Sequence, residues 1–97
     1  MKNKITVLEA RAIAVDYIFQ LSERVGIKII LIDDLTIEIS NGWVFFYDTE
    51  SYVQTGNSHD ALMGNLPVFV SESGGEPKII DLRGLESYQK SDDNKLG

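Results

Sequence analysis

The chain has 97 residues, no cysteine and a formal net charge of −6, from 15 acidic and 9 basic side chains. This length fits one compact domain, and the missing cysteines exclude a disulfide scaffold, thiol catalysis and thiolate metal sites. A negative surface repels phosphate, which disfavours nucleic acid and anionic membranes as partners.

The first predicted element is a long amphipathic helix that begins after Thr6. Thr6 and Glu9 have the spacing of a capping box, in which each side chain accepts a hydrogen bond from the other residue's backbone N–H. Gly26 is the expected stop, and Phe19 falls opposite the apolar stripe, where we expect it to be exposed. The stripe itself comprises Val7, Ala10, Ile13, Ala14, Tyr17, Ile18, Leu21 and Val25.

Three strands are expected next, at residues 27–32, 35–40 and 43–48, with a turn at Asp33 and Asp34 between the first two. Asn41 and Gly42 are the pair typical of a type I′ hairpin turn, which would pair Ile39 with Val44. This register predicts an apolar face, on which the long helix should pack, formed by Leu35, Ile37, Ile39, Val44 and Phe46. The other face would carry Trp43, Phe45 and Tyr47 beside Thr36 and Glu38. Either residues 49–66 fold over these aromatic rings, or the rings form part of a binding surface.

The second half of the chain predicts short elements. Residues 50–56 and 58–64 each resemble a short helical turn closed by glycine, with Ser58 or Asp60 as the N-cap of the second. Residues 68–72 and 78–82 should form a second hairpin, and residues 85–90 a final short helix. The predicted fold is therefore α+β. One domain over residues 1–90 would have a long N-terminal helix on a mainly antiparallel sheet of about five strands, a short helical crossover and a short C-terminal helix, followed by a frayed polar tail at residues 91–97.

The acidic charge is concentrated in the middle of the sequence. Residues 1–30 have five basic and three acidic side chains, residues 78–97 have four of each, and residues 31–77 have eight acidic and no basic ones. One interpretation is that these carboxylates are simply solvated. The other is a continuous acidic face that steers a basic partner toward the protein.

No residue pattern in the chain is typical of an active site. Ser58, His59 and Asp60 have the residue types of a hydrolase triad, but adjacent side chains diverge. His59 is the only histidine, so a metal site would need several carboxylates around it. Ser73-Gly74-Gly75 lies between two predicted strands and lacks the spacing of a phosphate-binding loop. We therefore expect no enzymatic activity, no cofactor and no metal.

The segment Gly42-Trp43-Val44-Phe45-Phe46-Tyr47 resembles the immunity protein 35 family. Further matching positions are Glu9-Ala10, Ala14, Tyr17, Tyr52, Thr55-Gly56, Leu62, Gly64-Asn65, Pro67, Val70, Gly74-Gly75, Leu85-Glu86 and Tyr88. The positions that carry over as family-pattern residues are Trp43, Tyr52, Gly56, Gly64, Asn65 and Pro67. The resemblance implies a small cytoplasmic α+β protein that binds and neutralises a toxin domain of a bacterial polymorphic toxin system.

A carboxylate-rich, aromatic surface would suit a toxin with a basic active-site cleft. The predicted contact residues for such a toxin are Glu38, Trp43, Asp48, Glu50, Tyr52 and Asp60. One alternative is a general protein-binding or chaperone-like module without a dedicated toxin, and a second is a small hydrolase that uses His59. The sequence shows neither a signal-peptide pattern nor a long apolar run, which favours a cytoplasmic protein without membrane contact.

Overall fold

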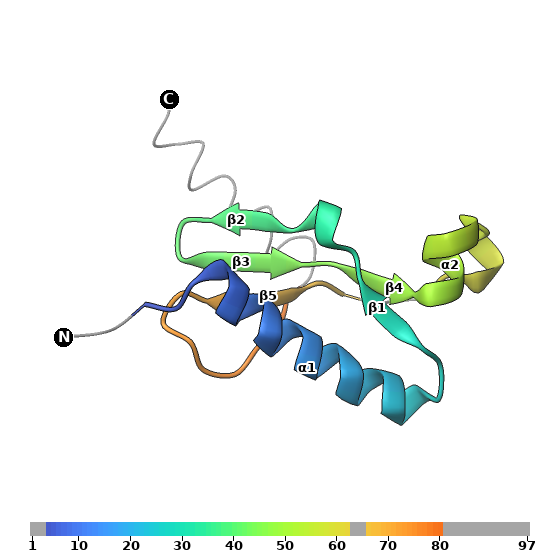
Figure 1. Cartoon of the computed structure of the whole chain (residues 1–97), viewed down its shortest axis with the longest axis horizontal. Coiled ribbons are helices and arrows are strands. Elements are labelled where there is room, and N and C mark those ends of the chain that lie inside the picture. The colour runs from blue at the N-terminus through green and yellow to red at the C-terminus, as the bar shows by residue number, and fades with distance from the viewer. Residues whose placement is uncertain (1–3, 63–65, 81–97) are drawn as a thin grey trace.

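The computed structural model describes residues 4–62 and 66–80. In chain order the elements are α1 (Val7–Val25), β1 (Ile29–Leu31), the 3₁₀ turn η1 (Asp33–Leu35), β2 (Ile37–Ile39), β3 (Gly42–Phe45), β4 (Tyr47–Thr49), α2 (Glu50–Thr55), the 3₁₀ turn η2 (Ser58–Asp60), β5 (Val68–Ser71) and β6 (Lys78–Ile79). The predicted α+β class, with a long N-terminal helix on antiparallel strands and a short second helix, is confirmed (Figure 1). The predicted helix at residues 85–90, the tail at 91–97 and the cap at Gly64 lie outside the described residues.

Helix α1 begins and ends where the local pattern predicts. The Glu9 N–H donates to Thr6 Oγ1 at 3.2 Å, and the Thr6 N–H donates to Glu9 Oε1 at 2.8 Å, which completes the capping box. At the other end Gly26 takes a left-handed conformation with φ 74° that closes the helix. Phe19 is exposed, as expected for its side of the helix.

The strands form two antiparallel sheets, ordered β2-β3-β5-β6 and β1-β4. The single strand predicted at residues 43–48 divides at Phe46, so that β3 pairs with β2 and β5 while β4 pairs with β1. Two pairings bracket η1: the Ile32 N–H donates to the Phe46 carbonyl at 2.8 Å, and Ile37 pairs with Val44. The chain between Ile32 and Ile37 is longer than the opposite stretch between Val44 and Phe46, and its extra residues form η1.

The predicted register of the first hairpin is wrong. Ser40 and Asn41 form the turn, so Ile39 pairs with Gly42 and not with Val44. No described non-glycine residue has a positive φ, and Gly42 is not among the left-handed glycines, so the type I′ geometry is absent from this turn. Glycine is required there because a Cβ would overlap the carbonyl oxygen of Val70 and lie 2.8 Å from the ring of Phe69. The register differs by two residues, an even number, so every side chain keeps its predicted face.

Helix α1 covers the face opposite to the predicted one. Phe45 and Tyr47 are buried against Ala10, Ala14 and Ile18 of α1, with Trp43 half-buried at the margin and Val68 and Val70 completing the cluster. Both expectations for the aromatic face are therefore wrong: α1 packs over it, with Leu62 of the crossover at the same cluster, and the buried rings of Phe45 and Tyr47 do not form a binding surface. Small residues at positions 10 and 14 let the helix approach closely enough for the rings to fill the space beneath it. The sheet face predicted to receive the helix holds a second apolar cluster of Ile39, Val44 and Phe69, with Ile37, Phe46 and Ile80 packed on it.

The first helical turn of the crossover and the second hairpin follow the prediction, whereas the turn predicted at residues 58–64 is the shorter 3₁₀ turn η2, after which Ala61 is extended. Thr49 caps α2 by accepting from the Tyr52 N–H at 3.0 Å, and Gly56 ends the helix with φ 73°. The cap of η2 is Asn57, whose side chain accepts from the His59 N–H at 3.0 Å, not Ser58 or Asp60. Strands β5 and β6 pair antiparallel as expected.

Candidate functional site

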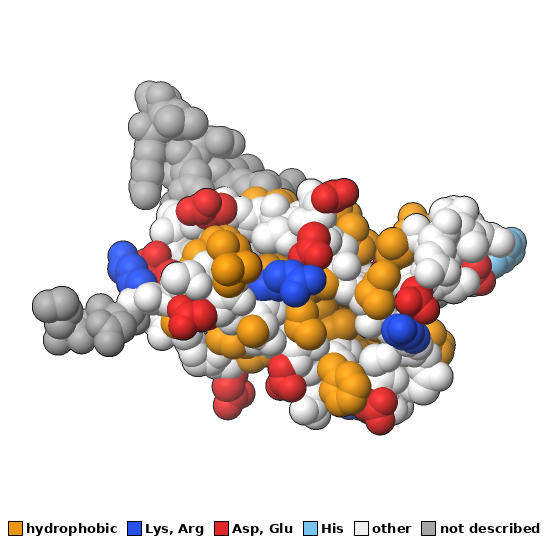
Figure 2. All heavy atoms as spheres, viewed as in Figure 1, with side chains coloured by type: hydrophobic (Ala, Val, Ile, Leu, Met, Phe, Trp, Pro, Cys, Tyr) orange, Lys and Arg blue, Asp and Glu red, His pale blue; other side chains and the backbone are white. Residues whose placement is uncertain are grey.

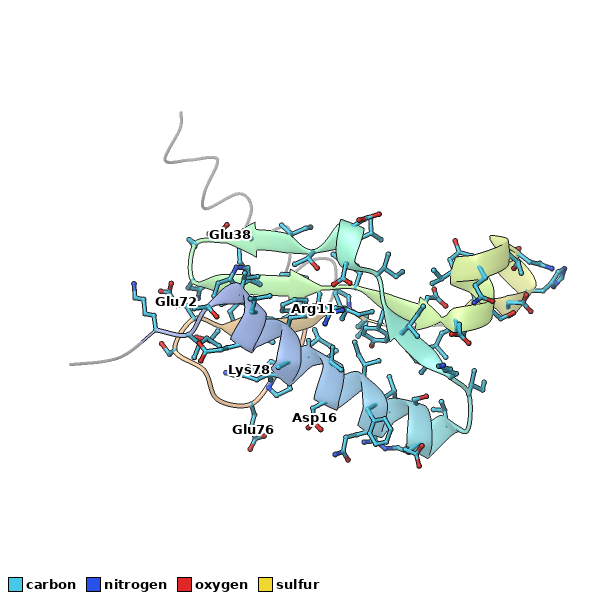
Figure 3. The ribbon with its side chains drawn as sticks, viewed as in Figure 1. Arg11, Asp16, Glu38, Glu72, Glu76 and Lys78 are labelled. Carbon is cyan, nitrogen blue, oxygen red and sulfur yellow. The ribbon has the colours of Figure 1, made fainter. Side chains whose placement is uncertain are left out.

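The six predicted contact residues lie in two groups, one on the β2–β3 hairpin and one around β4 and α2. Glu38 is exposed on β2 and pairs with Trp43 of β3 across the hairpin; Figure 3 labels Glu38. Asp48, Glu50, Tyr52 and Asp60 belong to β4, α2 and η2 (Figure 1). The structure therefore brings four of the six together and leaves two apart.

Asp48 is buried and its carboxylate is engaged within the fold. Its Oδ1 atom accepts from the N–H groups of Thr49 and Leu62, each at 2.7 Å. The Thr49 hydroxyl donates to the Asp60 carbonyl at 2.6 Å, and the Thr55 hydroxyl donates to Asp60 Oδ2 at 3.3 Å. This network fastens α2 and η2 to β4. Glu50, Tyr52 and Asp60 stay partly exposed around it, whereas Asp48 faces inward.

The central carboxylates do not form a surface of one sign. Arg11 holds Asp33 by two hydrogen bonds, Nε to Oδ1 at 2.7 Å and an Nη atom to Oδ2 at 2.9 Å. Lys28 pairs with Glu50 at 3.4 Å, and Lys4 pairs with Glu72 at 3.5 Å. All three cations come from the first thirty residues, so folding places them among the acids of residues 31–77. Figure 2 shows the result on one face, where Lys and Arg side chains lie beside some of the acidic ones.

Three described groups have shifted pKa values. The hydrogen bonds from Arg11 lower the pKa of the Asp33 carboxyl, and the same contact raises the pKa of the Arg11 guanidinium, in each case against an opposing effect of burial. Burial raises the pKa of the Tyr47 phenol, and the nearby Tyr17 adds to this shift. These are the shifts of a surface ion pair and a core phenol, and none of them belongs to a cluster typical of acid–base catalysis.

A groove of about 770 Å³ lies between α1 and β1, and we call it the α1–β1 groove. Val15, Phe19 and Ser22 line its helix side, and Ile27, Ile30 and Leu31 line its strand side. Val15, Phe19 and Ile27 are exposed although they are large and apolar. Figure 2 shows hydrophobic side chains over this region between α1 and β1. An open apolar groove of this kind is suited to binding another molecule.

Ser22 closes part of the free edge of β1 inside this groove. The Ile29 N–H points away from β4 and donates to Ser22 Oγ at 3.1 Å, while the Ser22 hydroxyl donates to the Ile27 carbonyl at 2.6 Å. A side chain that satisfies the backbone of an edge strand protects that strand from pairing with other chains. The groove therefore offers apolar side chains more than open backbone hydrogen-bonding groups.

A second, smaller hollow of about 410 Å³ lies beside α2, lined by Ile27, Thr49, Ser51, His59, Asp60 and Leu62. We call it the α2-end hollow. It shares Ile27 with the α1–β1 groove, so the two form adjoining parts of one surface. Among the described residues the His59 imidazole has no hydrogen bond to Ser51 or Asp60, and no group of three or more His, Cys, Asp or Glu side chains is placed to bind a metal ion.

The sequence did not predict the α1–β1 groove. Phe19 was expected to be exposed on its own, because the helical pattern places it away from the core stripe. The missed signal is that Leu8, Ala12, Val15 and Phe19 recur at helical spacing and form a second stripe on the same helix. Only the folded chain brings Ile27 and Ile30 beside this second stripe.

The immunity protein 35 family model matches the chain over residues 8–90. The chain belongs to the immunity protein 35 family. This confirms the resemblance drawn from the Gly42–Tyr47 segment. The matched range includes both walls of the groove and the α2-end hollow of this immunity protein 35 family member. Neither the curated proteins nor the solved structures give a match. No described helix is long and apolar enough to cross a membrane.

Proposed function

We propose that this protein is an immunity protein that binds a cognate bacterial toxin domain and covers the toxin's active or substrate site, in a stoichiometric complex and without catalysis. The observation that carries this proposal is the family match, which extends over residues 8–90 and so includes nearly every described element. An inhibitor of this type requires a stable fold with an accessible contact surface, and it requires no reactive groups of its own.

The chemistry of the described surface supports a binding role. His59 is exposed on the rim of the α2-end hollow, and the Asp60 carboxylate accepts from Thr55, while the Asp60 carbonyl accepts from Thr49. A nucleophile, a base and an orienting acid connected by hydrogen bonds are what a hydrolase would need, and this arrangement does not supply them. The alternative of a hydrolase that uses His59 is therefore not part of the proposal.

The contact surface we propose includes Glu50, Tyr52 and Asp60 at the α2 end, because these predicted residues are partly exposed and Asp60 lines the α2-end hollow. Glu38 and Trp43 would join this surface only if the toxin extended to the β2–β3 hairpin. Asp48 would act indirectly, by holding α2 and η2 in place.

Co-expression tests this proposal directly. The toxin domain encoded beside this gene is expressed in a sensitive host with and without the protein, and survival and complex formation on a sizing column are measured. We expect survival and a stoichiometric complex, both of which the His59→Ala variant should retain. A protein that gives no survival and no complex would refute the proposal. Equal binding to unrelated aggregation-prone proteins would favour the chaperone-like alternative.

A further inference from the structure

We propose that the outward face of α1, together with the α1–β1 groove, is the surface that docks the toxin, and that the docking element of the toxin presents apolar side chains beside lysine or arginine. This inference rests on the proposed function and adds to it the location of the interface and the chemistry of the partner.

The first observation is an apolar stripe on the side of α1 that points away from the core. Leu8 is 75% exposed and Phe19 is 59% exposed, with Val15 and the small Ala12 between them on the same side. Ile27 continues the stripe across the groove at 49% exposure. Single exposed apolar residues are common on proteins, but several large ones aligned along a helix and beside a groove are typical of an interface. Such a contact would centre on Phe19, an aromatic side chain suited to anchoring a partner.

The second observation is a row of carboxylates along one flank of this stripe. Glu9, Asp16 and Glu23 are spaced by seven residues, which places them on one side of the helix. All three side chains are exposed, and none belongs to the ion pairs of the described residues. Asp16 extends from the outer side of α1 in Figure 3.

The cations nearest the groove are already neutralised by the protein's own carboxylates. Arg11 lines the groove and is held by Asp33, and Lys28 lines it and pairs with Glu50. The other cation of α1 is Arg24 in its last turn, so the three exposed carboxylates of the row outnumber it and the charge that α1 leaves for a partner is net negative. A complementary surface would carry lysine or arginine along one side of its apolar contact.

A second copy of this chain does not meet that requirement. If two α1 helices packed antiparallel along the stripe, a two-fold axis would bring each carboxylate row against the other, and like charges would face each other. If they packed in parallel, the row would face the flank of Arg11, whose guanidinium is already bound to Asp33 of its own chain. The charge pattern therefore favours a different, basic partner.

The proposed docking face continues into the contact residues at the α2 end. Ile27 lines both the groove and the α2-end hollow, and the ion pair of Lys28 with Glu50 joins the start of β1 to the start of α2. Glu50 and Asp60 would then contribute at the margin of one interface whose apolar centre is at Val15 and Phe19.

The test compares apolar variants for their affinity to the catalytically inactivated toxin domain of the neighbouring gene, measured by titration calorimetry. Phe19→Ala should raise Kd by about tenfold or more, since it removes the central apolar anchor. The matched control is Ile79→Ala, which shortens an exposed aliphatic side chain on the far strand β6 and should change Kd by less than about threefold. Thermal unfolding of each variant shows whether the fold is intact.

Charge variants test the second half of the proposal. Asp16→Lys should slow association by about threefold or more at low ionic strength and weaken its dependence on salt, because it reverses one charge of the carboxylate row. The matched control is Asp34→Lys, the same change of charge at an exposed position on η1.

The outcomes separate the inference from the proposed function. If the wild-type protein binds and protects while Phe19→Ala and Asp16→Lys bind as the wild type does, the docking face is wrong and the immunity function stands. If the wild-type protein neither binds nor protects, both are wrong. If sedimentation shows a dimer that Phe19→Ala converts to a monomer, the occupant of this face is a second copy, and the inference is overturned.

Discussion

Replacing Asp48 by alanine tests the role that the structure gives to a residue first predicted as a toxin contact. The carboxylate is buried, and its Oδ1 atom accepts two backbone hydrogen bonds of 2.7 Å, from Thr49 and Leu62. Asp48→Ala removes this acceptor and leaves two backbone N–H groups without their partner. The expected result is lower stability and a loosened crossover.

The magnitude follows from those two bonds. A hydrogen bond to a charged group contributes about 1.5–3 kcal/mol, and the variant also relieves the cost of burying a carboxylate, so we expect a net loss of about 3 kcal/mol. A domain of this length has a total stability of roughly 5–15 kcal/mol, so the loss is a large fraction of the total. The midpoint of thermal unfolding should fall by about 15 °C.

Urea unfolding followed by circular dichroism measures the free energy, and amide hydrogen exchange locates the effect. The Leu62 N–H should exchange much faster in Asp48→Ala than in the wild type, while amides in the middle of α1 should change only with global stability. Asp48→Asn is the matched control, because it keeps an oxygen acceptor without the charge and should cost about 1 kcal/mol. An alanine variant within 0.5 kcal/mol of the wild type, or an unchanged Leu62 amide, would refute the reasoning. Below its unfolding midpoint Asp48→Asn should still bind the toxin, and a large loss of affinity in a folded variant would place Asp48 in the interface.

Three further predictions concern the fold. Gly42→Ala should destabilise by about 3 kcal/mol in urea unfolding, because its Cβ would overlap the Val70 carbonyl oxygen on the paired strand; a neutral result would contradict the close approach of β3 and β5. Thr6→Ala should cost about 1 kcal/mol and Thr6→Ser much less, since serine keeps the capping hydroxyl; equal losses would argue against the cap. Asp33→Asn should cost less than about 1 kcal/mol at pH 7, because its bond to Arg11 is exposed to solvent. The pKa of Asp33 is lowered from its ordinary 3.8 in the folded state, so the pair stabilises the fold above that pH, and the difference between variant and wild type should vanish as the pH falls through the lowered value.

Local interactions explain why some elements could be predicted. The capping box joins residues three apart, and the left-handed conformations of Gly26 and Gly56 end α1 and α2 in their own sequence context. The alternation of side chains in β2 and β3 predicted which residues share a face, and this survived a change of register by two residues. The predicted position of the hairpin turn was wrong. Gly42 lies in β3, where the close approach of β5 leaves no room for a Cβ, and β5 lies more than twenty residues later in the chain.

The choice of the face that α1 covers depended on contacts distant in sequence. Both faces of the sheet are apolar, one rich in aromatic rings and the other in aliphatic side chains, so hydrophobicity alone does not select between them. The selection came from shape, because Ala10 and Ala14 leave space that Phe45 and Tyr47 fill. The groove could not be predicted either, because its two walls, the exposed side of α1 and β1, come together only in the folded chain.

The sequence by itself determined the composition, the local caps, the strand alternation and the family pattern, all of which depend on residues close to one another or on the identity of the residues alone. It also determined that the negative charge is concentrated in residues 31–77. Only the tertiary structure decided where that charge acts. Lys4, Arg11 and Lys28 lie far from Glu72, Asp33 and Glu50 along the chain, and folding brings each pair within 4 Å. Three of the eight carboxylates of the acidic centre are therefore paired with cations. Glu9, Asp16 and Glu23, in the segment with a positive net charge, are exposed along α1, and Glu23 lines the groove. Electrostatic complementarity depends on distance in space, and distance in space is a property of the fold.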